Sequence, residues 1–277
     1  MSPTSVPHPL PFPSLFEGVP EPATRWLGRR RFLLGAVAST NDDARELLQR
    51  EGPAAHGAAF FTDRQLAGRG RHGRSWTVPP GRSLALSVCL WPPADQGERL
   101  SLLPAAAAGA VAETIRRLAG VEARLKWPND VLVGEKKVAG TILEASWSGE
   151  RPAGAVLGIG VNLLQRESDW PPLLRETAAS LAQVAPRPPE APAFLARLLE
   201  ALESFADSAL GEGPPLRPRL EPLWVHRPGE VLRVTLLEGE AEGTFAGFGP
   251  AGELLLETPG GLRAIRNGDA HRLRRDR

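Results

Sequence analysis

The sequence of 277 residues contains a single cysteine, Cys89. One cysteine excludes an internal disulfide framework and any zinc site built from several cysteines. Cys89 lies in the apolar run 84–90, and we interpret it as a small buried core residue. No apolar stretch of 18 residues and no signal peptide are present, so we expect a cytoplasmic protein that does not span a membrane.

An excess of charge of one sign is also missing. The 33 Lys and Arg residues face 32 Asp and Glu residues, which leaves a net charge of +1. A dedicated DNA-binding domain usually carries a basic face, so this balance argues against nucleic-acid binding as the main task. Apolar residues make up 42% of the chain, which is enough for one large domain or a medium domain with a small one.

Lysine is rare: only three of the 33 basic residues are lysines, and the other 30 are arginines. Lys126, Lys136 and Lys137 lie within twelve positions of one another. An ammonium is a compact point charge, whereas a guanidinium is a planar fork, so a lysine persists in an arginine-rich sequence where arginine cannot replace it. This segment is therefore the first candidate for chemistry, although three residues can also cluster by chance.

Composition divides the chain into three parts. Residues 1–27 are rich in proline and predict an irregular arm. A large domain over 28–218 is expected to hold strands at 32–37, 58–62, 84–90, 122–127 and 155–163, a hairpin over 131–145, and helices at 43–50, 101–119 and 192–210. A proline linker at 214–218 leads to a region, 225–277, with short strands at 231–237, 240–247 and 254–257, which is typical of a small β-barrel.

A glycine- and arginine-rich segment lies in the polar loop expected over 63–81. Gly68 and Gly70 let backbone N–H groups face a ligand. The charged side chains are those of Arg69, Arg71 and Arg74. Together they predict an anion-binding cradle, with Trp76 available to stack on a base or close the loop. The alternatives are a solvated flexible loop or an RNA contact, although RNA-binding segments of this kind repeat many times.

Two lysine-containing motifs follow. In Lys126–Asp130 a strand ends by presenting an amide, Asn129, beside a carboxylate, Asp130, which can bind phosphate or metal or accept a proton. The alternative is an ordinary turn. In the next strand Lys136 and Lys137 face opposite sides, so one of them points into a pocket unless both are hydrated hairpin residues. Gly140 permits close approach of a ligand.

The segment Gly158–Asn162 matches half of a dinucleotide-binding fingerprint. The third glycine is missing and no P-loop is present, so a Rossmann nucleotide site is poorly supported. A glycine-interrupted strand ending in Asn162 fits the wall of a binding site better.

In this order and spacing, the motifs resemble those of the biotin protein ligases, or biotin–[acetyl-CoA-carboxylase] ligases. The matching segments are Ser39–Asn41, Gln65–Trp76, Lys126–Asp130, Lys137–Glu144 and Gly158–Asn162, and the resemblance covers roughly residues 30–274. It implies an α/β (α+β) fold: a mixed sheet with helices on one side, similar to class II aminoacyl-tRNA synthetases, in the large domain, which would be catalytic. An SH3-like barrel follows it.

The resemblance implies a two-step reaction that uses biotin, ATP and Mg²⁺. Biotin's carboxylate attacks the α-phosphate to give biotinyl-5′-AMP, and a lysine of the biotin carboxyl carrier protein of acetyl-CoA carboxylase then displaces AMP. By resemblance, Lys137 bridges the carboxylate and the α-phosphate, because a compact ammonium can contact both. Arg69 and Arg71 clamp the anions, and Asp130 helps to deprotonate the incoming lysine.

The resemblance also implies which residues bind the ligands. Ser39, Thr40 and Gln65 would hydrogen-bond the ureido group of biotin, although the first two also suit a helix N-cap. The other implied ligand-binding positions are Asn41, Gly68, Gly70, Arg74, Trp76, Asn129, Gly140, Gly158, Gly160, Asn162 and, at the ATP phosphates, Arg274. No residue is assigned as a metal ligand.

The N-terminal arm departs from part of the family pattern. Some members carry a winged helix that binds DNA, whereas only the proline-rich arm precedes the catalytic core here, so we expect no specific DNA binding. A homodimer formed by sheet contacts is compatible with the family. Two alternative functions remain: a lipoate–protein ligase, and a non-enzymatic nucleic-acid-binding protein that uses the basic loop.

Overall fold

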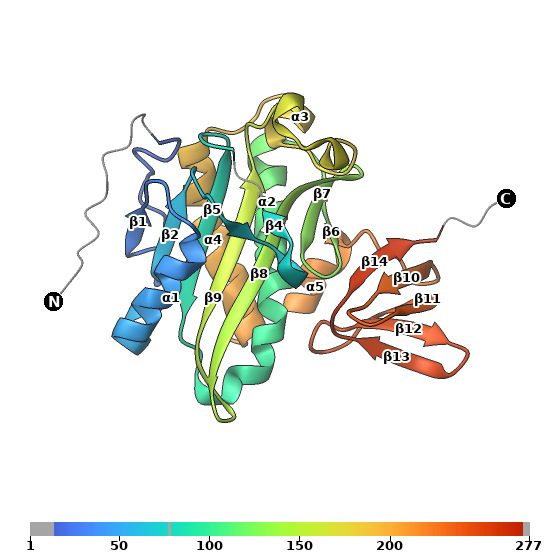
Figure 1. Ribbon diagram of the computed structural model, residues 1–277. Coiled ribbons are helices and arrows are strands. Elements are labelled where there is room, and N and C mark those ends of the chain that lie inside the picture. The colour runs from blue at the N-terminus through green and yellow to red at the C-terminus, as the bar shows by residue number, and fades with distance from the viewer. Residues whose placement is uncertain (1–13, 77–78, 274–277) are drawn as a thin grey trace.

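The large domain is built on a seven-stranded sheet with the strand order β1-β2-β5-β9-β8-β7-β6 (Figure 1). The computed structural model describes residues 14–76 and 79–273. Strands β1 (Arg31–Leu33) and β2 (Ala59–Thr62) are parallel, and the other neighbours in the sheet are antiparallel. These are β5 (Ser83–Leu90), β6 (Ala123–Lys126), β7 (Asp130–Val133), β8 (Lys136–Ser148) and β9 (Arg151–Asn162).

Helices lie on both faces of this mixed sheet. Helices α2 (Leu103–Ala119) and α4 (Ala191–Leu210) pack against each other on one face, and α1 (Thr40–Glu51) lies over β2, β5 and β9 on the other. Side chains alternate along a strand, so Phe61 joins the core beneath α2 and α4 while Phe60 faces α1. The expectation of helices on one side only is wrong for α1, whose apolar stripe needs a face to bury.

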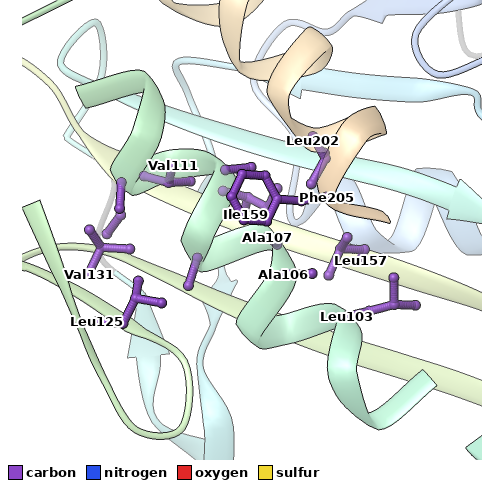
Figure 2. Packing of buried hydrophobic residues seen from close by; sticks show 14 of the residues in the cluster. Leu103, Ala106, Ala107, Val111, Leu125, Val131, Leu157, Ile159, Leu202 and Phe205 are labelled. Carbon is purple, nitrogen blue, oxygen red and sulfur yellow. The ribbon is translucent and has the colours of Figure 1, made fainter. Parts of the chain in front are cut away.

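The core between the sheet and α2 is formed by small and large side chains that interlock (Figure 2). Alanines of α2, among them Ala106 and Ala107, are fully buried and let the helix lie close to Leu157 and Ile159 of β9. Phe205 of α4 fills the space on the other side of α2. This packing fixes the strands whose opposite face carries the site. Among the described residues, no helix is both long and apolar enough to cross a membrane.

The main elements predicted from the sequence are present, and the short ones were missed. Strand β1 is shorter than expected, the proline linker holds the helix α5 (Leu216–Leu220), and the polar loop folds into the small hairpin β3 (Gly68–Arg69) and β4 (Ser75–Trp76). A further short helix is α3 (Leu181–Val184). Short 3-10 turns occupy Gly52–Ala55, Arg71–Gly73, Ala94–Leu102, Glu167–Asp169, Pro172–Leu174 and Glu221–Leu223.

The C-terminal region forms a five-stranded antiparallel sheet with the order β13-β12-β11-β10-β14. Its strands are β10 (Val231–Thr235), β11 (Glu240–Phe248), β12 (Leu254–Thr258), β13 (Gly261–Ile265) and β14 (Asp269–Arg272). The first three strands were predicted. The last two were not, because β14 is short and mostly polar and β13 lacks a clear alternating apolar pattern. Pairing of β14 with β10 brings Asp269 to the edge that faces the large domain.

Residues 14–27, the described part of the expected arm, contain no helix or strand and lie against the large domain. Phe16 is fully buried and meets Phe61 edge-on, with ring centroids 6.0 Å apart. The carboxylate of Glu203 in α4 accepts backbone N–H bonds from Arg25, Trp26 and Leu27 at 2.8 to 3.0 Å. Burial opposes the charge of Glu203, but these hydrogen bonds outweigh it and lower the pKa of the carboxyl.

We predict that Glu203→Gln destabilises the fold by about 2 kcal/mol at pH 7, because a charge-assisted acceptor of three N–H groups is lost. The folded pKa is lowered, so the contribution is complete above the unfolded pKa of about 4.3 and disappears as the pH falls through the folded pKa. Urea unfolding at pH 7 and pH 3 measures the difference. The control Glu46→Gln alters an exposed carboxylate of α1, and an equal effect of both variants would contradict the prediction.

Candidate active site

The face of the sheet beyond α1 is hollow because its side chains are small. Ala85 pairs with Gly160 and Ser87 pairs with Gly158 across β5 and β9, and Gly140 of β8 pairs with Gly160. A cavity of about 1460 Å³ opens above this floor and extends to the C-terminal sheet. Nearly all residues singled out from the sequence line it, including Ser39, Thr40, Gln65, Arg74, Asn129 and Lys137. Arg274 lies outside the described residues.

The start of α1 forms one wall of the cavity. Ser39 occupies the N-cap position of the helix, as expected, but its side chain makes no capping hydrogen bond. Thr40 is buried, and its backbone N–H donates to Gln65 Oε1 at 2.9 Å. The Thr40 and Ser87 hydroxyls lie 2.6 Å apart. Polar groups that line a buried pocket and are held in this way can distinguish the donors and acceptors of a ligand.

The carboxamide of Asn41 is engaged on both sides by the protein. Its Oδ1 accepts from Ser87 Oγ at 2.5 Å, and its Nδ2 donates to Glu144 Oε1 at 2.9 Å. A Cβ atom on Gly158 would lie 2.6 Å from Asn41 Oδ1, so this glycine makes room for the amide. The absence of a side chain at Gly158 therefore allows the Asn41 amide to lie against the floor of the pocket.

The arginine loop is the hairpin β3–β4, and Figure 1 shows β4 crossing in front of β8 and β9. Gly68 and Arg69 pair with Trp76 and Ser75, and Gly70 donates its N–H to the carbonyl of Arg74 at 2.7 Å. The turn between them includes His72 and Gly73, which both have positive φ. In the structure a hairpin therefore presents the three arginines.

Each arginine of the loop is held by an acidic residue. Arg69 makes a two-pronged pair with Asp42 at 2.7 and 3.0 Å, and the hydrogen bond from Arg69 lowers the pKa of Asp42. Arg74 pairs with Asp269 of β14, and Arg71 lies 3.9 Å from the same carboxylate.

The surroundings of Asp269 shift two pKa values. Burial opposes the charge of Asp269, but Arg74 and Arg71 together hold its pKa below the usual range. Burial lowers the pKa of Arg71. The cluster therefore concentrates fixed charge where the hairpin meets the C-terminal sheet, and the largely buried Arg71 would gain most from an anionic ligand.

Trp76 lies over the floor of the cavity at Gly160. A Cβ atom on residue 160 would collide with the indole ring, so only glycine permits this packing. Lys137 Nζ lies 5.5 Å from the centroid of the same ring, within the range of a cation–π contact. The tryptophan thus connects the arginine hairpin to the lysine on β8.

Lys137 and Asp130 face each other on neighbouring strands. Lys137 Nζ lies 2.5 Å from Asp130 Oδ1, and about a third of the lysine side chain is exposed. Gly140, which pairs with Asp130, leaves space for the ammonium, since a Cβ there would lie 3.2 Å from Nζ. Lys136 points away, and its Nζ donates to the carbonyl of Arg175 at 3.0 Å. The expected division between an inward and an outward lysine is confirmed.

Asn129 and Asn162 are held by the protein as well. Asn129 Nδ2 donates to the carbonyl of Thr141, and its Oδ1 accepts a long bond of 3.4 Å from Arg71. Asn162 Nδ2 donates to the carbonyl of Ala179 at 3.1 Å, and Oδ1 accepts from Gln165. Asn162 therefore braces the segment that clamps the backbone of Lys137, through bonds from Lys137 N to Thr177 O and from Ala179 N to Lys137 O.

Several site residues were missed from the sequence. Asp42 and Glu144 stand at the edges of quoted motifs, so their proximity to Arg69 could have been suspected. Ser87 is hidden in an apolar run, where a single hydroxyl gave the only hint. Asp269 and His271, which also line the cavity, come from a strand with no motif. Burial, together with nearby Lys126, lowers the pKa of His271.

The oxygen atoms in the cavity bear on whether it suits a magnesium ion. The described residues contain no group of three or more His, Cys, Asp or Glu side chains placed to hold a metal. Mg²⁺ is commonly bound by phosphate oxygens, waters and one or two protein oxygens. Asn129 Oδ1 and the Asp130 carboxylate line the cavity, so the protein has one or two oxygens for an ion that arrives with a nucleotide, although Arg71 contacts the Asn129 oxygen.

Comparisons with known proteins agree with this geometry. The model of the Biotin/lipoate A/B protein ligase family matches residues 35–162. The biotin–[acetyl-CoA-carboxylase] ligase of Paracoccus denitrificans is 34% identical over 250 residues, covering 84% of this chain and 96% of that protein. The bifunctional ligase/repressor BirA of Bacillus subtilis is 31% identical over 248 residues, covering 89% of this chain and 75% of that protein.

The architecture is also that of a solved structure. The biotin protein ligase of Aquifex aeolicus, in complex with biotin and ATP, aligns with a TM-score of 0.74 and 28% identity. The alignment covers 89% of this chain and 100% of that chain. With relatives more than 30% identical over most of their length, and with the family motifs gathered around one cavity, this chain belongs to the biotin protein ligases.

Proposed function

We propose that this protein activates biotin with ATP to biotinyl-5′-AMP and transfers biotin to a specific lysine of the biotin carboxyl carrier protein of acetyl-CoA carboxylase. The observation that carries the proposal is that one cavity joins two unlike regions. A small polar pocket at Thr40 and Gln65 suits a ureido ring. A cationic region around Arg71, Arg74 and Lys137 suits a carboxylate and phosphates.

In the first step two anions must meet. A carboxylate oxygen of biotin attacks the α-phosphorus of ATP, the bond to the β-phosphate oxygen breaks, and pyrophosphate leaves. Lys137 is the cation that bridges the carboxylate and the α-phosphate, because its ammonium stands over the floor of the cavity beside Gly140. Arg69 and Arg71 hold the outer oxygens and exchange their carboxylate partners for those of the substrates.

The remaining residues orient the substrates and exclude water. Ser39, Thr40 and Gln65 bind the ureido group, and the floor at Gly158 and Ile142 packs against the apolar part of biotin. Trp76 packs near the adenine, and the hairpin with Gly68 and Gly70 closes over the adenylate, which slows hydrolysis. Mg²⁺ would accompany ATP and neutralise phosphate charge, with Asn129 as the protein oxygen beside it.

In the second step the ε-amine of the carrier lysine attacks the acyl carbon of the adenylate. The acyl–phosphate bond breaks, AMP leaves, and the nitrogen loses a proton as the amide forms. Asp130 lies beside Lys137 at the reacting end of the cavity, and we assign it to accept that proton. Its ion pair with Lys137 keeps the carboxylate oriented.

Finer features of the organisation belong to the same proposal. We assign residues 28–218 to a catalytic domain similar to class II aminoacyl-tRNA synthetases and residues 225–277 to an SH3-like barrel. The short antiparallel strands of the C-terminal sheet support the second assignment. We further propose cytoplasmic localisation, a homodimer, and no specific DNA binding, which the balanced net charge of +1 supports.

The test of the function is biotin-dependent exchange of pyrophosphate into ATP, followed by transfer to a carrier domain. We expect exchange with biotin and none with lipoate, because the pocket at Thr40 and Gln65 is polar. Transfer should modify one lysine of the carrier. Exchange with lipoate alone would overturn the proposal in favour of a lipoate ligase, and salt-sensitive DNA binding without exchange would favour a nucleic-acid-binding protein.

We predict that Lys137→Arg lowers the exchange rate at least about 30-fold, or about 2 kcal/mol, although the charge is kept. The planar guanidinium is wider than the ammonium that lies beside Gly140 and Trp76, and it cannot place one compact charge between both anions. Steady-state exchange measures the effect. The matched control Lys136→Arg changes the neighbouring outward lysine and should keep full activity; near-normal exchange by Lys137→Arg would refute the bridging role.

We predict that Asp130→Asn slows transfer more than adenylation. The amide cannot accept the proton of the carrier lysine, whereas Lys137 keeps its charge for the first step. Single-turnover transfer from preformed biotinyl-5′-AMP and pyrophosphate exchange measure the two steps separately. If both steps lose the same factor, Asp130 acts by positioning Lys137 or by binding a metal, and its assignment as the base is wrong.

A further inference from the structure

We propose that a buried chain of hydrogen bonds, starting at Glu144 and running through Asn41 and Ser87, makes the hydroxyl of Thr40 a hydrogen-bond acceptor toward the ligand. Because the hydrogen bonds run in this direction, the site prefers an acid whose ring carries an N–H donor to an acid whose ring has none. The inference rests on the proposed function, in which that donor is the ureido N–H of biotin. Glu144, Asn41 and Ser87 are specificity-determining residues that act through Thr40.

The chain begins at a group that can only accept. The carboxylate of Glu144 is ion-paired with Arg45 and lies 3.7 Å from Arg69 Nε. A carboxylate accepts hydrogen bonds and donates none. Asn41 must therefore turn its Nδ2 toward Glu144, as the 2.9 Å bond shows, and this fixes Oδ1 on the side of Ser87.

The direction is then passed to two hydroxyls. Ser87 Oγ has one proton, and it goes to Asn41 Oδ1 at 2.5 Å. Either hydroxyl could donate across the 2.6 Å contact between Ser87 and Thr40, but the proton of Ser87 is already used. Thr40 therefore donates to Ser87, and the lone pairs of its oxygen remain for another partner.

A competing arrangement is weaker. Thr40 Oγ1 also lies 3.3 Å from Gln65 Oε1, which already accepts the backbone N–H of Thr40 at 2.9 Å. The much shorter contact with Ser87 requires a proton between the two oxygens, so Thr40 cannot give its proton to Gln65 without leaving two acceptors 2.6 Å apart.

Because Thr40 is buried, the direction of its hydrogen bond affects the affinity for a ligand. Ser87 is fully buried and Thr40 is only 2% exposed, yet Thr40 lines the cavity. A ligand N–H facing Thr40 completes the chain, whereas a ring without one leaves a buried acceptor unpaired and loses affinity. The dithiolane ring of lipoate has no N–H. The hydrogen-bond chain therefore distinguishes biotin from lipoate, the two acids in the name of the family whose model matches residues 35–162.

The test compares biotin with two isosteres in which each ureido N–H in turn is replaced by a ring oxygen. We expect the wild-type protein to prefer biotin over one isostere by about 100-fold or more in kcat/KM for pyrophosphate exchange. In Ser87→Ala the Thr40 hydroxyl is free to turn and donate to the ring oxygen. The preference should fall about 10-fold or more, with the change in KM rather than in kcat.

Glu144→Gln provides a second variant at a partly exposed position, should Ser87→Ala fail to fold. A carboxamide can donate as well as accept, so the chain can run in either direction and the preference should also fall. Thr114→Ala is the matched control, since it removes a buried hydroxyl that bonds only within α2. It should keep the wild-type preference.

The possible outcomes separate the two proposals. A preference that stays unchanged in Ser87→Ala or in Glu144→Gln overturns the hydrogen-bond chain. A wild-type protein that performs no exchange with biotin overturns the proposed function itself. A wild-type protein that exchanges with biotin but does not discriminate against either isostere leaves the function standing and removes the role of Thr40.

Discussion

The arrangement of the site depends on ion pairs that keep several cations around one cavity in the absence of a ligand. Lys137, Arg69 and Arg74 would repel one another if left unpaired, and each has a carboxylate partner from a different part of the chain. These partners are Asp130 on the neighbouring strand, Asp42 in the first turn of α1 and Asp269 in the C-terminal sheet. The ion pairs thus hold the cations in fixed positions around the cavity, where an anionic ligand would meet them.

The sheet makes this arrangement possible because its two faces differ. One face carries large apolar side chains beneath α2 and α4, which supply the core. The other face carries Ala85, Ser87, Gly158 and Gly160 where β5 and β9 cross the site, so it leaves a hollow instead of a core. Period-two alternation lets the same strands perform both tasks, and rigidity on one face supports precise geometry on the other.

The outer parts of the chain depend on the same centre. The C-terminal sheet contributes Asp269 to the arginine hairpin, and Trp127 of the Lys126–Asp130 segment donates to the carbonyl of Gly252 at 3.0 Å. The C-terminal sheet therefore meets the large domain at the end of the cavity that holds Arg71 and Arg74. The end at Thr40 is instead organised from inside the large domain, by hydrogen bonds that lead from Glu144 to Thr40. Charge and hydrogen-bond direction are thus set separately at the two ends.

The sequence by itself determined the long elements and the motifs. Apolar periodicity located α2, α4, β5 and β9, and the ordered motifs indicated the family and Lys137, because local pattern and chemistry are written in consecutive residues. The tertiary structure alone decided the partners. Ser87 and Asp269 lie in no motif, and the motif that ends at Glu144 assigned this residue no role. Their contacts arise from sheet register and from pairs of residues up to about two hundred positions apart. It also decided that Asn41 and Asn162 are braced by the protein, since a side chain's free donors and acceptors are known only when its neighbours are.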